Sequence, residues 1–276
     1  MKLSNRIKEL IFETRSNNFP NRYLRNIEEF EYDFFIKNIS DENFVFNCIS
    51  KIVSGDVLIL RSAASHVLCK KIINYLDNFA KTENLISHKV LDGIKNGFYV
   101  SRNIGGSSYQ TYDRSFYFFS WNKDQTNFYQ EVMSLYKPLK ILNGLQEDEI
   151  TNNIPSDGVV ERMHIIHYPN GGGEISKHVD PIKFANANFG LYCTQFGIDY
   201  DKGGFFVENS QKQKVEIDKR IQIGDLVIFF PGLIHGVDPV FVNKKNQSSM
   251  SGRWFCNINL TESHHSKSRE TSKGIK

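Results

Sequence analysis

The feature that most constrains the fold is a run of about eight short strand-like segments between residues 157 and 260. Glycine, proline, asparagine and aspartate separate these segments, and these residues favour turns. The segments read GVVERMHIIHYP, SKHVDP, FGLYCTQFGI, GGFFVEN, QKVEIDKRIQIG, DLVIFFPG, IHGVDPV and GRWFCNINL. Strands at this spacing predict a β core that is either a barrel or a double-sheet jelly roll.

Residues 1–156 have a different pattern, in which apolar residues mostly recur at helical spacing. The expected helices cover about 3–11, 44–52 and 68–76, and a further one begins near Asp124. One short buried strand is expected at 55–61. We therefore expect residues 1–156 to be mostly helical support for the core at 157–260, so that residues 1–260 form a single domain.

Two polar segments have less definite patterns. Residues 101–116 are rich in Gly, Ser and Tyr and could form either a lid over a site or an ordinary surface loop. Residues 261–276, TESHHSKSRETSKGIK, contain almost no apolar side chains to bury and predict a disordered tail.

The composition narrows the class of protein. Apolar residues make up 40% of the 276 residues, which is enough to bury a core. The net charge of +3 comes from scattered positive residues, which argues against a dedicated nucleic-acid surface. The first residues lack the apolar stretch of a signal peptide, and no apolar run is long enough for a membrane span. We expect a cytoplasmic protein with no membrane or nucleic-acid partner.

Three residues in the strand-rich half are candidate metal ligands. In ISKHVDP, His178 and Asp180 are two positions apart, so in a β-strand they point to the same side. His235 follows an aromatic strand and a Pro-Gly turn. Any one of these residues alone would more often be structural. Together, two His and one carboxylate form the ligand set of non-haem Fe(II) oxygenases, whereas a closed zinc site needs a fourth ligand that the cysteines are not spaced to supply.

The order of these motifs resembles the 2-oxoglutarate- and Fe(II)-dependent oxygenase superfamily, especially its prolyl-hydroxylase-like branch. The resemblance covers about residues 157–260 and includes YPNGGG, the H-x-D pair, GGFFV, IQIGDLVIFFPGLIH and GRWFCNI. It implies a double-stranded β-helix, a jelly roll with the helices packed on the larger sheet. It also implies that His178, Asp180 and His235 hold Fe(II), and that Arg253 binds the far carboxylate of 2-oxoglutarate.

Two positions refine this resemblance. The interval from His235 to Arg253 is longer than usual for the branch, owing to the polar loop at 241–251. Insertions of this kind are thermodynamically tolerable, so Arg253 remains the expected anchor, with Lys244 or Lys245 as the alternative. In related halogenases, Gly or Ala replaces the carboxylate ligand. Asp180 therefore implies hydroxylation or another oxidation instead of halogenation.

Strand alternation predicts which side chains line the pocket. If Tyr168 faces inward, as the matching tyrosine of the family does, Arg162 and His164 share its face. On the final strand, Asn257 shares the face of Arg253. Arg162 and His164 would either pair with internal carboxylates such as Asp157 or Glu208, or bind a polar substrate. We take these two residues, together with Asn257, as candidate substrate contacts.

The family often places a hydroxyl group beside the 2-oxoglutarate carboxylate, from the strand that contains GLYCTQF. Tyr192 or Thr194 would supply it here, with Gln195 as the rival if the register differs by one residue. Tyr168 completes the expected cofactor contacts.

The resemblance implies a dioxygenase that uses Fe(II), 2-oxoglutarate and O2, with ascorbate as a possible reductant. The leading hypothesis is hydroxylation of an unactivated C–H bond in a small polar molecule, such as an amino acid or a biosynthetic intermediate. A prolyl-type peptide or protein hydroxylase is the alternative, and a non-catalytic metal-binding jelly roll is the third possibility. The substrate and the oligomeric state stay open.

Overall fold

The computed structural model describes residues 3–17, 21–82, 89–102, 109–122, 126–243, 248 and 250–275. Its helices are α1 Leu3–Asn17, α2 Tyr32–Asn38, α3 Glu42–Val53, α4 His66–Thr82 and α5 Asn127–Tyr136, with 3-10 helices η1 Lys137–Asn143, η2 Pro155–Asp157 and η3 Asp218–Arg220. The strands are β1 Asn26–Glu31, β2 Asp56–Arg61, β3 Gly97–Arg102, β4 Thr111–Phe118, β5 Val159–Pro169, β6 Gly173–Val179, β7 Asn188–Tyr192, β8 Lys202–Glu208, β9 Lys214–Glu216, β10 Leu226–Phe229, β11 His235–Phe241, β12 Gly252–Glu262 and β13 Lys273–Gly274. None of the helices in these ranges is long and apolar enough to cross a membrane.

The strands form one continuous sheet that has a larger and a smaller part. The larger part runs β1-β2-β10-β7-β12-β5-β4, and β3 pairs with β4. The smaller part runs β6-β11-β8-β9, and the pairing of β4 with β6 joins the two. Apart from the parallel pair β1–β2, all these named strand pairs are antiparallel. The predicted mainly β jelly-roll core is therefore confirmed.

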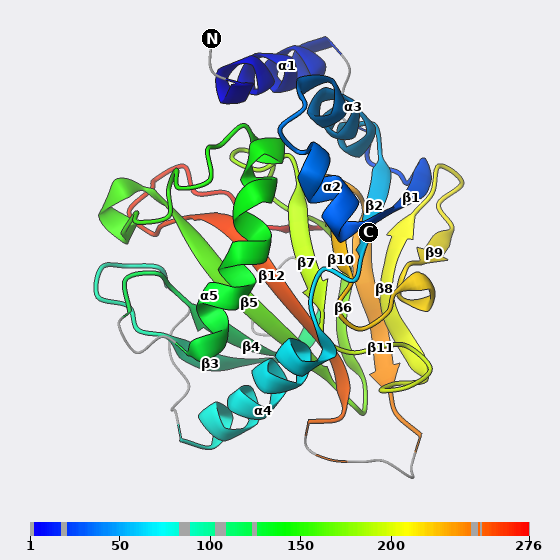
Figure 1. The fold of residues 1–276 in the computed structure, drawn as a ribbon. Coiled ribbons are helices and arrows are strands. Elements are labelled where there is room, and N and C mark those ends of the chain that lie inside the picture. Colours follow the sequence, from blue (N-terminus) through cyan, green and yellow to red (C-terminus); the bar gives the residue numbers. More distant parts are fainter. Residues whose placement is uncertain are drawn as a thin grey trace.

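The helices cover one face of the larger part of the sheet, as predicted. Figure 1 shows α2, α4 and α5 in front of the strands, with β5, β7 and β12 behind them. Alternate residues of β5, among them Met163 and Ile165, are buried on this side. In the same alternation, Glu161 forms a fully buried ion pair with Lys140 of η1. The opposite face of β5 is left for the interior of the jelly roll.

The first half contains more strand than the sequence pattern predicted. Within the segment 101–116, interpreted as a lid or a loop, residues 101–102 and 111–116 belong to the paired strands β3 and β4, and β4 lies between β5 and β6. Residues 103–108 of that segment lie outside the described residues. The sequence pattern did not predict β4 because alternate positions of this strand are small or polar. Thr111 and Ser115 both donate hydrogen bonds to Asp113, at 2.5 and 2.6 Å. The apolar pattern therefore did not indicate a strand, because this face of β4 is held by hydrogen bonds instead of apolar contacts.

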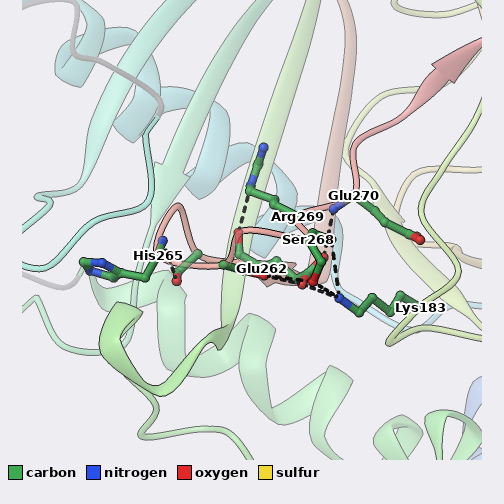
Figure 2. Close-up of polar contacts among 8 residues, drawn as sticks. Lys183, Glu262, His265, Ser268, Arg269 and Glu270 are labelled. Atoms are coloured by element: carbon green, nitrogen blue, oxygen red, sulfur yellow. Dashed lines mark hydrogen bonds and ion pairs between the residues drawn. The ribbon is translucent and has the colours of Figure 1, made fainter.

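The C-terminal segment also differs from the prediction of a disordered tail at 261–276. Strand β12 continues to Glu262, and residues 273–274 pair with β6 beside His178. Figure 2 shows the polar contacts around Glu262: its Oε1 accepts from Lys183 Nζ at 2.7 Å, and its Oε2 accepts from the Glu270 N–H at 2.9 Å. Its main-chain oxygen accepts from Arg269 Nε at 3.0 Å. Polar contacts, which composition does not reveal, order this segment.

Candidate metal centre

Two neighbouring strands bring the three predicted ligands together. His178 lies near the end of β6, Asp180 directly follows that strand, and His235 begins β11 as the register partner of His178. The Nε2 atoms of His178 and His235 lie 3.6 Å from Oδ1 and Oδ2 of Asp180, respectively. One ligand atom from each residue lies within 4.8 Å of the other two. The group forms one compact N,N,O set.

Hydrogen bonds fix the orientation of each ligand. The Nδ1 atoms of His178 and His235 lie 2.9 and 2.8 Å from the main-chain oxygens of Ser176 and Leu233. With Nδ1–H donating to these oxygens, Nε2 of both rings carries the lone pair that a metal needs. In this tautomer, both imidazoles present Nε2 as a potential metal ligand.

The carboxylate ligand is held from both sides. Asp180 Oδ2 accepts a hydrogen bond from Asn188 Nδ2 at 2.8 Å, and Oδ1 accepts one from Ser272 Oγ at 2.7 Å. Burial opposes ionisation of Asp180, but its hydrogen bond and charge interaction with His235 bring its pKa below the usual range. Burial, together with His235, lowers the pKa of His178 to about 4. This set of two imidazoles and one carboxylate fits Fe(II) and leaves three of six octahedral positions for other ligands.

The triad lies in the wall of a cavity of about 330 Å³. Its other lining residues come from β4–β8, β10, β11, β12, the segments before β4 and after β6, and the C-terminal segment. Tyr109 stacks on His178 with ring centroids 5.1 Å apart. The volume is at the lower end of the roughly 300–1,000 Å³ of small-molecule sites.

Arg253 lines this cavity, but it already has a carboxylate partner. Its Nε donates to Asp218 Oδ2 at 2.7 Å, and both side chains are almost fully buried. The same oxygen accepts from Tyr200 Oη at 2.6 Å and from the Phe205 N–H at 2.9 Å. Asp218 therefore fixes the position of Arg253, and a second Asp218 contact at 3.3 Å engages Nη2. That Arg253 binds 2-oxoglutarate stays a prediction.

The candidate hydroxyl groups near Arg253 differ in their surroundings. Tyr192 lies with its ring 4.8 Å from the Arg253 guanidinium carbon, and its buried hydroxyl has no hydrogen-bond partner in the described part of the chain. Thr194 Oγ1 instead accepts from the Trp254 N–H at 2.7 Å. Tyr168 lines the cavity, with its ring 5.4 Å from the same guanidinium carbon. Neither Tyr192 nor Thr194 is among the residues that line the cavity, so the contact of either hydroxyl with 2-oxoglutarate stays a prediction.

The candidate substrate contacts also face the cavity, in the register that alternation predicted. Arg162, His164, Tyr168 and Asn257 all line it. His164 Nε2 lies 2.9 Å from Ser115 Oγ, and burial, with the charge of Arg162, lowers its pKa well below the usual value. Asn257 Oδ1 is buried and has no hydrogen-bond partner among the described residues. These roles in substrate binding stay predictions.

The alternative internal partners of Arg162 are engaged elsewhere. Glu208 pairs with Lys177 at 2.8 Å, and Asp157 accepts from the Ile154 N–H at 2.8 Å. Lys244 and Lys245, the rival anchors for 2-oxoglutarate, lie outside the described residues.

Several residues of the site were not predicted. They are Asp218, Asn188, Tyr109, Tyr117, Arg269 and Ser272. A carboxylate such as Asp218 has no local signal, because it is 35 residues from its arginine in sequence. Tyr109 and Tyr117 belong to the stretch around the segment interpreted as a lid or loop, and Arg269 and Ser272 to the expected tail.

The sequence and the structure were compared with those of known proteins. No protein-family profile and no curated protein matches this sequence. Among solved structures, a prolyl hydroxylase from Trichoplax adhaerens, in complex with a hypoxia-inducible factor oxygen degradation domain peptide fragment, has a TM-score of 0.53 at 12% identity. The alignment covers 82% of this chain and 91% of that one.

Two further structures are similar at lower scores. A Pseudomonas putida prolyl-4-hydroxylase has a TM-score of 0.48 at 12% identity, covering 80% of this chain and 99% of that chain. A full-length Neurospora crassa protein, solved in complex with alpha-KG, has a TM-score of 0.47 at 13% identity, covering 88% of this chain and 86% of that chain. At the level of the fold, the resemblance seen in the sequence is therefore confirmed: the chain has the jelly roll of a prolyl hydroxylase, with a His-Asp-His group inside it.

Proposed function

We propose that this protein is an Fe(II)- and 2-oxoglutarate-dependent dioxygenase that hydroxylates an unactivated C–H bond of a small polar molecule. The observation that carries the proposal is the meeting of His178, Asp180 and His235 in the wall of a cavity that also contains Arg253. Bound there, Fe(II) with O2 would supply the oxidation of 2-oxoglutarate to succinate and CO2 that accompanies substrate hydroxylation.

The protein's own residues have separate tasks in this proposal. His178 and His235 would present Nε2 to the metal, and Asp180 would offset part of its charge. Arg253, held by Asp218, would pair with the far carboxylate of 2-oxoglutarate, and the Tyr192 hydroxyl would donate a hydrogen bond to it. The aromatic wall at Phe205, with the other apolar lining residues, would limit access of water to this end of the cavity.

The cavity supports a small substrate over a peptide. Residues 269–272 of the C-terminal segment line it together with β5 and β12, so the wall extends beyond the sheet strands. A volume of about 330 Å³ has to contain both 2-oxoglutarate and the reacting part of the substrate. A peptide hydroxylase is the second candidate, because the prolyl hydroxylase with the same fold was solved with a peptide fragment. It would require a surface trough that leads to the metal ligands.

The test is Fe(II)-dependent turnover of 2-oxoglutarate against two panels, one of amino acids and small metabolic acids and one of proline-containing peptides. A small molecule that couples 2-oxoglutarate consumption to its own hydroxylation supports the proposal. Coupling by peptides alone would favour the second candidate. A metal-loaded protein that turns over no 2-oxoglutarate would favour the non-catalytic jelly roll.

A further inference from the structure

Two arginines from distant parts of the chain line the same cavity beside the metal ligands. Arg162 is on β5, and Arg269 is in the C-terminal segment. Arg162 Nε donates to Asn259 Oδ1 at 3.3 Å, and its guanidinium carbon lies 4.8 Å from the centre of the Tyr117 ring. Neither contact supplies a negative charge. Among the described residues, no carboxylate lies within 4.0 Å of the Arg162 nitrogens.

Arg269 is similarly without a carboxylate partner. Its Nε donates to the main-chain oxygen of Glu262, while the Glu262 carboxylate is occupied by Lys183, Ser266 and the Glu270 N–H. Figure 2 shows the Arg269 guanidinium pointing away from the Lys183 amine. Within the described part of the chain, hydrogen bonds engage only the Nε of Arg162 and of Arg269. The Nη groups of both are therefore left for a ligand.

The nearest carboxylates act on the two arginines only through space: Asp180 on Arg162 and Glu262 on Arg269, and among the described residues neither forms an ion pair with them. Burial lowers the pKa of Arg162, and the nearby charge of Arg269 lowers it further. Glu270 is an exposed residue at the cavity and forms no ion pair with either arginine among the described residues. Arg253, by contrast, is neutralised by Asp218. Two partly buried like charges without an ion-pair partner are costly, and a bound anion would reduce that cost.

We propose that Arg162 and Arg269 form an anion-binding pair that takes a carboxylate or phosphate group of the substrate. This inference rests on the proposed function and narrows its substrate to a small anionic molecule. Guanidinium groups suit this task because each can donate two parallel hydrogen bonds to such a group. Ser272, three residues after Arg269, donates to the Asp180 carboxylate, so the C-terminal segment would supply both a substrate contact and a support for the metal site.

The pair can be tested without knowing the substrate. The protein is saturated with Zn²⁺, as a redox-inert metal, and with 2-oxoglutarate, and is then titrated with acetate, inorganic phosphate or acetamide while binding is followed by calorimetry and thermal unfolding. Arg162→Met and Arg269→Met are compared with Arg220→Met, which removes an exposed arginine from η3. We expect acetate or phosphate, but not neutral acetamide, to bind. Each cavity variant should lower the affinity for the preferred anion by about tenfold or more, as expected for a lost charge-assisted hydrogen bond.

The results of these titrations distinguish a carboxylate substrate from a phosphorylated one and show whether the inference is wrong. Preference for acetate indicates a carboxylate substrate, and preference for phosphate indicates a phosphorylated one. Unchanged anion affinity in Arg162→Met and Arg269→Met, or an equal loss in Arg220→Met, would overturn the inference. If a variant unfolds, Arg162→Lys or Arg269→Lys, which keep the charge but lose the paired donors, replaces it and should show a smaller loss. A parallel titration of metal-free protein reads the anion site even if 2-oxoglutarate fails to bind, so failure of the proposed function is seen separately.

Discussion

Replacing Asp218 by Asn should reveal whether Arg253 is the 2-oxoglutarate anchor. The substitution keeps the shape of the side chain but removes the charge that neutralises a guanidinium with 1% exposure. Removing one partner of a buried ion pair costs about 3–5 kcal/mol. For a chain of this size, that loss lowers the unfolding temperature by roughly 2 °C for each kcal/mol, hence by about 6–10 °C.

The decisive measurement is how much 2-oxoglutarate raises the unfolding temperature of each protein. If its carboxylate pairs with Arg253, saturating 2-oxoglutarate with Zn²⁺ should stabilise Asp218→Asn more than the wild-type protein, because the ligand replaces the missing counter-charge. Glu161→Gln is the matched control, since it breaks another fully buried ion pair, with Lys140, on the helix-covered face of β5. That control should lose similar stability without extra stabilisation by 2-oxoglutarate. Differential scanning calorimetry measures both effects, and equal ligand-induced shifts in all three proteins would refute the assignment.

Three other substitutions test separate parts of the account. Arg253→Ala should raise the 2-oxoglutarate concentration needed for half-maximal turnover at least tenfold, whereas the same effect from Lys244→Ala or Lys245→Ala would move the anchor to the loop. Asn188→Ala removes a hydrogen bond to the carboxylate ligand and should weaken Fe(II) binding about 10–100-fold, as measured by metal titration. Burial lowers the pKa of His167 to about 3 from 6.5, so its unfolded form binds a proton that the folded form does not, and its contribution to stability is present above pH 6.5 and lost as the pH falls toward 3. His167→Phe can keep the stacking on the Trp254 indole. It should reduce the loss of unfolding free energy between pH 6 and pH 4 by about 1.4 kcal/mol per pH unit. An unchanged dependence of the unfolding free energy on pH in denaturant titrations would contradict this.

Local patterns predicted the parts of the site that depend on strand alternation. The two-residue interval between His178 and Asp180 and the parity of Arg162 with Tyr168 follow from the period of a strand, and both hold in the structure. Turn residues marked the ends of these strands, so the side chains that share one face could be predicted without long-range information. The helices with apolar faces followed from spacing for the same reason.

The unpredicted parts depend on contacts between segments that are far apart in sequence. Asp218 becomes informative only when the fold brings it beside Arg253. The C-terminal segment is polar, and its composition predicted disorder. In the structure, side-chain hydrogen bonds of Glu262 and Ser272 and the pairing of residues 273–274 with β6 hold it against the core. Composition measures the apolar surface available for burial, and it does not register order that is produced by polar contacts.

The most direct test of the central claim is the release of CO2 from carboxyl-labelled 2-oxoglutarate, with succinate measured in the same reaction. In the wild-type protein, release of CO2 should require both Fe(II) and O2. That release should be lost in His178→Ala and His235→Ala, while circular dichroism shows an unchanged fold. Full CO2 release by either variant, or release by the wild-type protein after Fe(II) has been removed by a chelator, would contradict the assignment of this triad as the catalytic metal centre.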